Sequence, residues 1–273
     1  GHCALKMGSM SSNSPQFIAE LVDAIRNNTL EANANLLLHA AQGGPENMEY
    51  LFQLGVHCAE QGRLIDAIYI FDCLQKVNSN DARFPYNLGF LYAAQGYYQK
   101  ASQFFEQALR ITPNDVETLV NYASALHELR HYDEAIHYYD LALKIQPNYV
   151  QALANKGNTL SKLEKYTEAM VQQERALAIE PDFATAWINK GATLFELKRY
   201  GDAVTCYERA FAINPNNDWF YGELVHSRMR ICLWEHFQED KKILEVQVGE
   251  NQKVIQPFPL LAISDDPLLH RQA

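Results

Sequence analysis

The chain has 273 residues, of which 48% are hydrophobic and 21% are charged, a composition typical of a folded protein. Its net charge of −10 would repel a phosphate backbone, and no basic stripe in the sequence offsets that charge, so nucleic acid is excluded as a partner. No apolar run approaches the roughly 20 residues of a membrane-spanning helix, and the first residues do not have the layout of a signal peptide, so we expect a cytoplasmic protein without a membrane partner.

The N-terminal region contains two different segments. Residues 1–14 include a Gly-Ser-Met run and show little apolar periodicity, so we expect a tag-like or unstructured tail with the native start at Met10. In residues 15–47, apolar side chains recur at helical spacing between Phe17 and Gln42. This spacing predicts a degenerate N-terminal helix pair.

Prolines in the centre of the chain recur every 34 residues, with Ser79 in the one slot that lacks a proline. The prolines on this spacing are Pro45, Pro113, Pro147, Pro181 and Pro215. Ten residues after each slot stands a small residue: Gly55, Gly89, Ala123, Gly157 and Gly191. Twelve residues further on stands an alanine: Ala67, Ala101, Ala135, Ala169 and Ala203.

A large side chain follows each of these alanines after four residues. The members of this column are Phe71, Phe105, Tyr139, Gln173 and Tyr207, and Gln173 is the one that is not aromatic. We expect the small residues to lie where two helices touch, and the large ones to fill the space between neighbouring helices.

This pattern resembles the tetratricopeptide repeat, in which 34 residues form two antiparallel helices. The resemblance covers residues 48–217 and gives five repeats. It implies an all-α, right-handed superhelical solenoid with an inner concave groove. The first helix of a repeat should end at a short polar turn such as Gln95–Gly96, and the second should end near an Ile-x-Pro segment, because proline cannot continue a helix. Residues 218–252 keep helical spacing without these landmarks, which predicts capping helices.

An asparagine stands two positions before the small residue in every repeat after the first: Asn87, Asn121, Asn155 and Asn189. Gln53 holds the same place in the first repeat, and Asn158 could widen the polar strip one turn along from Asn155. The resemblance implies that first helices line the concave groove. A row of carboxamides, each both donor and acceptor, would suit the backbone of an extended protein or peptide partner. The alternative is that these asparagines tie adjacent helices together or face water.

Residues that could carry chemistry are scattered. His127, His131 and His137 lie in one repeat, but His131 is predicted in a turn and no other ligand completes a metal site. The five cysteines contain no C-x-x-C pair, so we expect most to be buried apolar residues: Cys3, Cys58, Cys73, Cys206 and Cys232.

Catalytic motifs are also absent from the sequence, which has no phosphate-binding loop, nucleophile elbow or H-E-x-x-H segment. Four titratable residues near the C-terminus are predicted to form a solvated helix face: Glu235, His236, Glu239 and Asp240. We therefore predict no enzymatic activity, no metal and no cofactor for this chain.

The C-terminal region carries a second resemblance. The Ile-Cys-Leu-Trp segment at 231–234 and the Gln-Pro-Phe-Pro-Leu-Leu-Ala segment at 256–262 resemble the end of the repeat array in the O-linked N-acetylglucosamine transferase family and its SPINDLY-like members, with Leu233 in place of the usual aspartate. This implies a substrate-recognition arm of a nucleotide-sugar glycosyltransferase, with residues 253–273 starting a linker toward an absent catalytic domain. The chain would then be a part of a longer enzyme or a natural adaptor.

The alternative function is a free-standing adaptor or co-chaperone that clamps the C-terminal carboxylate of a partner. Such a clamp needs lysine and arginine side chains in the groove. Asn158 and Asn189 match its pattern in part, whereas Ala154 stands where a lysine is expected. Self-association into a homodimer also stays open.

Overall fold

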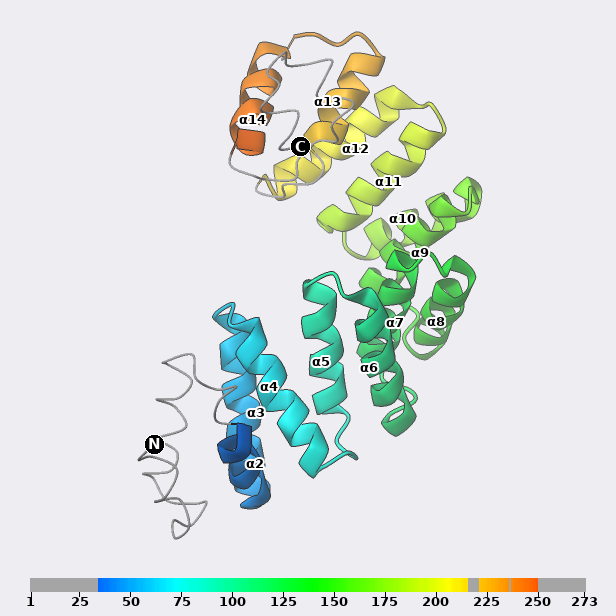
Figure 1. Ribbon diagram of the computed structural model, residues 1–273. Helices are drawn as coiled ribbons and strands as arrows, with labels where there is room; N and C mark the ends of the chain where they lie inside the picture. Colours follow the sequence, from blue (N-terminus) through cyan, green and yellow to red (C-terminus); the bar gives the residue numbers. More distant parts are fainter. Residues whose placement is uncertain (1–33, 216–220, 236, 250–273) are drawn as a thin grey trace. The chain divides into compact units, whose positions relative to one another are not determined.

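The computed structural model describes residues 34–215, 221–235 and 237–249. These residues form thirteen α-helices and no β-strand, which confirms the predicted all-α fold (Figure 1). Of the predicted N-terminal helix pair, helix α2 is described. Residues 15–33, the predicted tail at 1–14 and the predicted linker at 253–273 lie outside the described residues.

The chain divides into two compact units, residues 1–131 and 132–273. The described helices of the first unit are α2 (Ala34–Gln42), α3 (Pro45–Glu60), α4 (Leu64–Val77), α5 (Arg83–Ala94), α6 (Tyr98–Ile111) and α7 (Val116–Glu128). Those of the second unit are α8 (Tyr132–Ile145), α9 (Val150–Lys162), α10 (Tyr166–Ile179), α11 (Ala184–Glu196), α12 (Tyr200–Ile213), α13 (Tyr221–Arg230) and α14 (Phe237–Gly249).

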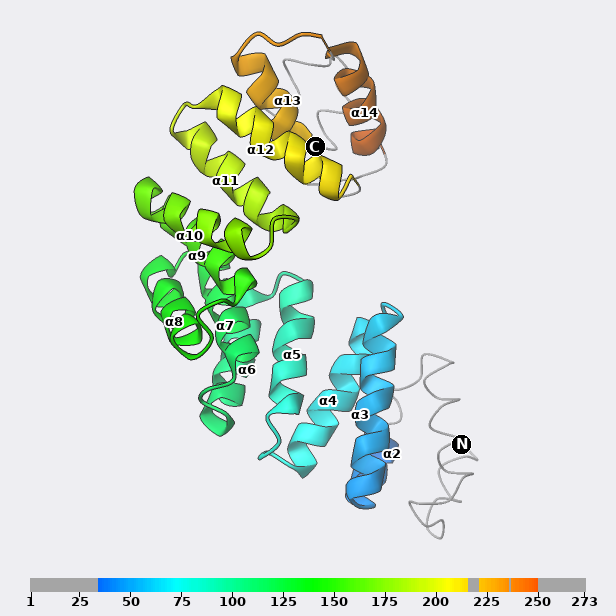
Figure 2. The same cartoon turned by 180° about the vertical axis from the view of Figure 1, so that it is seen from behind.

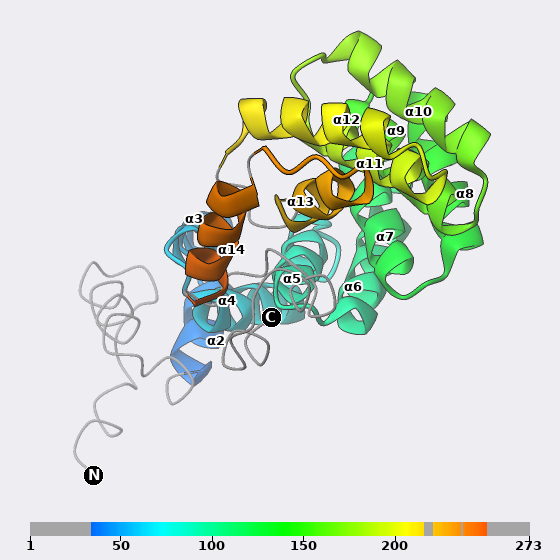
Figure 3. The same ribbon diagram turned by 90° about the horizontal axis from the view of Figure 1, so that it is seen from above.

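Within each unit, consecutive helices pack side by side as antiparallel hairpins. In the first unit α3 pairs with α4, and α5 pairs with α6 (Figure 2). In the second unit α9 pairs with α10, α11 pairs with α12, and α13 packs next against α12 (Figure 3). We use the term first helix for the helix that opens each 34-residue period: α3, α5, α7, α9, α11 and α13.

A residue in the left-handed backbone region ends the turn after each first helix. These residues have φ between 56° and 78° and recur every 34 positions: Gly62, Gly96, Arg130, Glu164, Lys198 and Cys232. In the turn at Gly96, the backbone N–H of Tyr97 donates to the carbonyl of Tyr92 at 2.9 Å, and the turn at Cys232 repeats this bond from Leu233 to Arg228. The α13–α14 connection therefore keeps the turn geometry of the repeats, although its sequence has lost their proline and alanine landmarks.

The second helices end where the sequence analysis placed them. Four of them end at an isoleucine that stands two residues before one of the prolines recurring every 34 residues: Ile111, Ile145, Ile179 and Ile213. This agrees with the inability of proline to continue a helix.

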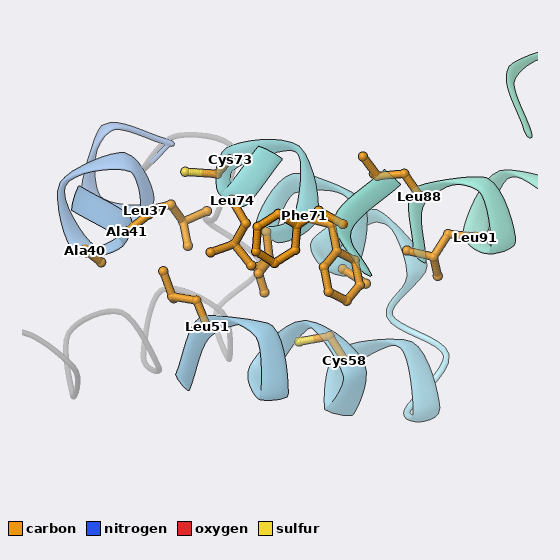
Figure 4. Packing of buried hydrophobic residues seen from close by; sticks show 13 residues of the cluster. Leu37, Ala40, Ala41, Leu51, Cys58, Phe71, Cys73, Leu74, Leu88 and Leu91 are labelled. Atoms are coloured by element: carbon orange, nitrogen blue, oxygen red, sulfur yellow. The ribbon is translucent and has the colours of Figure 1, made fainter. Parts of the chain in front are cut away.

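The core is built on contacts between the small residues that recur every 34 positions on the first helices and the large residues that recur on the second helices. A Cβ atom on Gly55, Gly89 or Gly191 would lie within 2.8 Å of the aromatic ring sixteen residues later: Phe71, Phe105 or Tyr207. The five alanines that recur every 34 residues, Ala67 to Ala203, all have an exposed fraction of 0%. The prediction that small residues lie where two helices touch is therefore confirmed. Figure 4 shows the ring of Phe71 in the core that α2 to α5 enclose.

Gln173 stands at the position where the other four repeats have a large aromatic residue. Its side chain is fully buried, and its Cγ lies 2.8 Å from where a Cβ of Gly157 would be. Its Nε2 donates to Thr193 Oγ1 at 2.8 Å and to the carbonyl of Asn189 at 3.2 Å. Its Oε1 is buried without a hydrogen-bond partner.

Three of the cysteines are buried, as predicted: Cys58, Cys73 and Cys206. Burial raises the pKa of Cys73 and of Cys206 to about 11. Cys232 is exposed, and Cys3 lies outside the described residues. His131 lies in the turn after α7, as predicted. The prediction that Asp240 lies on a solvated helix face is wrong, because its carboxylate is buried, accepts a hydrogen bond from the Tyr221 hydroxyl at 2.8 Å and pairs with Arg228 at 2.9 Å. No helix in the described ranges is both long enough and apolar enough to cross a membrane.

Candidate peptide-binding surface

The asparagine row lies on the first helices. In the first unit Gln53 is on α3, Asn87 on α5 and Asn121 on α7, and in the second unit Asn155 is on α9 and Asn189 on α11. The four asparagines are half-buried, and Gln53 is exposed. Their position, two residues before the small residue that touches the second helix, places them at the flank of a packed helix rather than on its fully solvated face.

Two of the asparagines join their helix to the preceding first helix. Asn121 Nδ2 donates to the hydroxyl of Tyr86 on α5 at 3.1 Å. Asn189 Nδ2 donates to the backbone carbonyl of Ala154 on α9 at 3.1 Å. In both pairs the partner is the residue 35 positions earlier, so the two hydrogen bonds are equivalent in the repeat.

The residue 35 positions earlier selects the partner of the amide. Ala154 has a small side chain, and the amide of Asn189 donates to its backbone carbonyl. Tyr86 has a hydroxyl group, and the amide of Asn121 donates to that hydroxyl instead of to a backbone carbonyl. For Asn87 the corresponding residue is Phe52, whose ring offers no such hydroxyl and lies 4.6 Å from the Arg83 guanidinium carbon. Asn87 Nδ2 donates instead within its own helix, to the carbonyl of Arg83 at 2.7 Å.

The side-chain oxygen atoms of these asparagines form fewer hydrogen bonds than their nitrogen atoms do. Asn155 Oδ1 accepts from Gln151 Nε2 at 3.0 Å. Within the described ranges, the Oδ1 atoms of Asn87, Asn121 and Asn189 accept no hydrogen bond. A carboxamide has two N–H donors and one oxygen. Each of these three side chains therefore keeps an acceptor for a further group. Asn158 lies half-buried one turn along from Asn155 on α9.

Tyr86 organises the polar contacts of α5 and α7. Its hydroxyl donates to Glu117 Oε1 at 2.6 Å while it accepts from Asn121. Burial, followed by the hydrogen bond to Glu117, raises the pKa of Tyr86. The hydroxyl thus stays protonated at neutral pH and holds both neighbours. A second link, the ion pair of Arg83 with Glu49 at 2.9 Å, joins α5 to α3.

Glu223 continues the row on α13, a position that the sequence analysis did not include. It stands 34 residues after Asn189. Ser227 Oγ donates to the Glu223 carbonyl at 2.7 Å, in the same way that Thr193 Oγ1 donates to the Asn189 carbonyl at 2.9 Å, so the two helices share one register. Burial, and then the Glu196 carboxylate, raise the pKa of Glu223. Extending the 34-residue spacing by one period would have found this residue.

A pocket of about 310 Å³ lies next to Asn121 in the first unit. It is bounded by α5, α6 and α7 and is lined by Phe90, Ala93, Ala94, Tyr98, Phe105, Asn121, Ser124, Ala125 and Glu128. Its walls are mainly methyl groups and aromatic rings. The alanine pair at the end of α5 is the sequence signal that could have predicted this pocket. Larger residues, His127 and Glu128, occupy the same two positions one period later, so the alanines leave space that the next repeat fills.

Known proteins match the chain at the level of repeats and fold. Three family models described as tetratricopeptide repeat match residues 92–157, 150–183 and 184–217. Comparison of the sequence with curated proteins gave no match.

Solved structures with a similar fold include three proteins of low sequence identity to this chain. TTC0263, a thermophilic TPR protein of Thermus thermophilus, has 19% identity and a TM-score of 0.57 over 68% of this chain and 100% of that chain. PilF of Pseudomonas aeruginosa has 16% identity and a TM-score of 0.61 over 73% and 90%. YrrB, described as a TPR protein with an unusual peptide-binding site, has 22% identity and a TM-score of 0.50 over 61% and 86%. The chain thus has the all-α fold of a tetratricopeptide solenoid, with the repeats recognised from residue 92 to residue 217.

Proposed function

We propose that the chain is a protein-interaction scaffold that holds an extended polypeptide against the asparagine-bearing flank of its first helices. The observation that carries this proposal is the recurrence of a half-buried carboxamide at one position of successive first helices, with Oδ1 acceptors that no described residue uses at Asn87, Asn121 and Asn189. Backbone N–H groups of a bound segment would donate to these oxygens, and such contacts do not depend on the side chains of the partner. The peptide-binding site of YrrB, a protein of similar fold, supports the proposal.

The finer proposal is that this scaffold is the substrate-recognition arm of an O-linked N-acetylglucosamine transferase-like glycosyltransferase. It is supported by the resemblance of residues 231–234 and 256–262 to the junction in that family. The first of these segments contains Cys232, the left-handed residue of the α13–α14 turn, and the second lies outside the described residues. In this proposal the chain holds the substrate, and another domain of the parent enzyme transfers the sugar.

The experiment compares binding of an array of unrelated unstructured peptides to the wild-type chain and to asparagine variants by fluorescence anisotropy. Asn87→Ala is the cleanest single variant, because its amide bonds only to its own helix, so its removal breaks no hydrogen bond between helices. The combined variant adds Asn121→Ala, Asn155→Ala and Asn189→Ala. A lost hydrogen bond of about 1 kcal/mol weakens binding roughly fivefold, so we expect Asn87→Ala to weaken all binding peptides by this factor and the combined variant to weaken them further.

Matched controls are Asn114→Ala and Asn148→Ala, which remove exposed asparagines in the turns between hairpins. We expect these two variants to bind as the wild type does. Thermal unfolding followed by circular dichroism checks that each variant is folded. If the folded combined variant keeps full affinity, the row is structural and the proposed function is wrong.

A further inference from the structure

The pocket beside Asn121 has the size of a site for one side chain. Its volume of about 310 Å³ is at the lower end of the roughly 300–1,000 Å³ found for ligand pockets. One of its lining residues, Phe90, is 54% exposed although it is aromatic and stands on a packed helix. Asn121 forms part of its wall, so a peptide backbone held by the Asn121 oxygen would lie next to the pocket.

The pocket exists because α5 ends in two alanines. Ala93 and Ala94 occupy positions that carry larger side chains in the later repeats, where the pairs are His127–Glu128, Ser161–Lys162 and Phe195–Glu196. The first repeat has Ala59–Glu60. Two alanines in succession occur at this position in the second repeat alone. The space next to Asn121 is therefore a property of one repeat and not of the generic fold.

The lining combines an apolar interior with one charge. Three alanines contribute methyl groups to the lining, and Phe90 and Tyr98 contribute aromatic rings. Glu128 is exposed, is the one charged residue among the lining residues, and forms no ion pair with a described residue. Burial and the Glu128 carboxylate together raise the pKa of Tyr98, which agrees with the carboxylate lying close to the pocket wall.

We propose that this pocket takes the side chain of a lysine or arginine of the bound polypeptide and makes the first unit selective for segments that carry a basic residue. The aliphatic stem would contact the alanine methyl groups, the cation would lie near the Glu128 carboxylate, and the exposed ring of Phe90 would add a cation–π contact. A fully apolar side chain would fill the same space but leave the carboxylate without a partner. This inference rests on the proposed function, because the backbone contact at Asn121 is what brings the side chain to the pocket.

The test uses a peptide from the array that binds the wild-type chain and contains one lysine. Its affinity is compared with that of the same peptide carrying norleucine, an uncharged residue of similar length, at that position. We expect the lysine peptide to bind about tenfold more tightly. Glu128→Gln should reduce this preference to about twofold, and Ala94→Leu, which fills the pocket from an exposed position, should weaken both peptides.

Glu60→Gln is the matched control. Glu60 is exposed, ends α3 as Glu128 ends α7, and stands at the equivalent position of another repeat. This variant should keep the full preference for lysine. If Glu128→Gln keeps the full, roughly tenfold preference for lysine and has an unchanged thermal unfolding curve, the proposal is wrong.

The outcomes separate the two proposals. If peptides bind and lose affinity in Asn87→Ala but show no preference for lysine over norleucine, the pocket proposal is wrong and the backbone-binding scaffold stands. If lysine is preferred and Glu128→Gln reduces the preference to about twofold, both are supported. If no peptide binds the wild-type chain, both are wrong.

Discussion

A Cβ atom on Gly89 would lie 2.7 Å from the Cδ1 and Cε1 atoms of Phe105. Real Cβ atoms do not approach carbon atoms this closely, so the ring of α6 rests directly on the backbone of α5. The same relationship joins Gly191 to Tyr207 in the second unit, at 2.8 Å. The distance between the two helices of a hairpin is thus set by the absence of a side chain on one and a ring on the other.

Gly89→Ala should therefore destabilise the first unit although alanine is the better helix former. Overpacking a well-filled core costs typically about 1–3 kcal/mol, which exceeds the gain of roughly 1 kcal/mol in helix propensity. Urea unfolding followed by circular dichroism measures the shift in midpoint, and Gly89→Ala/Phe105→Leu should recover part of the loss. Gly201→Ala is the control, because a Cβ there meets no atom within 4 Å and should not lower stability. Equal effects of the two Gly→Ala changes would contradict the packing explanation.

The turns provide a test of backbone strain without side-chain contacts. Gly96 has φ of 78°, and a Cβ there would meet nothing within 4 Å, so Gly96→Ala changes the backbone preference alone. We expect a loss of about 1 kcal/mol. Lys198, with φ of 61° at the equivalent turn of the second unit, should gain a similar amount on replacement by glycine. Both changes are measured by thermal or urea unfolding, and a stabilising Gly96→Ala would refute the assignment of the strain.

Gln173→Leu should stabilise the second unit. The change removes a buried Oε1 without a partner, and an unsatisfied buried polar group costs about 1–3 kcal/mol. The lost hydrogen bond to Thr193 Oγ1 matters less, because that hydroxyl still donates to the Asn189 carbonyl at 2.9 Å. The expected net gain is about 1 kcal/mol in the free energy of unfolding. A destabilised variant would mean that the amide contacts outweigh the orphaned oxygen.

Tyr86→Phe should destabilise the first unit by about 1–2 kcal/mol. The ring of Tyr86 packs against Phe105 with its centroid at 6.1 Å, and phenylalanine keeps that contact. Only the hydroxyl is lost, and with it the hydrogen bonds to Glu117 and from Asn121. Comparing the single variants with Tyr86→Phe/Asn121→Ala in a double-mutant cycle measures the coupling. Strictly additive effects would show that the Asn121–Tyr86 contact contributes nothing to stability.

Glu223→Gln should stabilise the second unit in a pH-dependent way. The pKa of Glu223 is raised in the folded chain, chiefly by burial and then by Glu196. A group with a raised folded pKa carries no penalty below its unfolded value near 4.5, and it lowers stability as pH rises through the folded value. The variant should therefore be more stable than the wild type at pH 7 and equal to it at about pH 4. Thermal unfolding at both pH values measures this, and a difference independent of pH would exclude ionisation as its cause.

The 34-residue spacing was sufficient to predict the helices, their turns and the contacts between small and large residues. These features depend on neighbours within one hairpin, and each hairpin repeats the same residue types at the same places. For this reason the pairing of Gly89 with Phe105 and the helix end at Ile111 could be expected from the residues alone. The α13–α14 hairpin was harder to recognise as a continuation of the repeats. The feature that it shares with them is the positive φ at Cys232, which the residue type does not predict.

The chemistry of the candidate surface depended on the three-dimensional arrangement. Asn87, Asn121 and Asn189 are the same residue at the same place in the repeat, yet their amides bond to a carbonyl of their own helix, to a hydroxyl and to a carbonyl of the neighbouring helix. A side-chain hydrogen bond follows the nearest available partner, and that partner belongs to a residue 35 positions away whose size varies from repeat to repeat. The pocket at Ala93 and Ala94 likewise arises from missing volume between three helices. Periodicity records which residues repeat, whereas these contacts depend on the residues that do not.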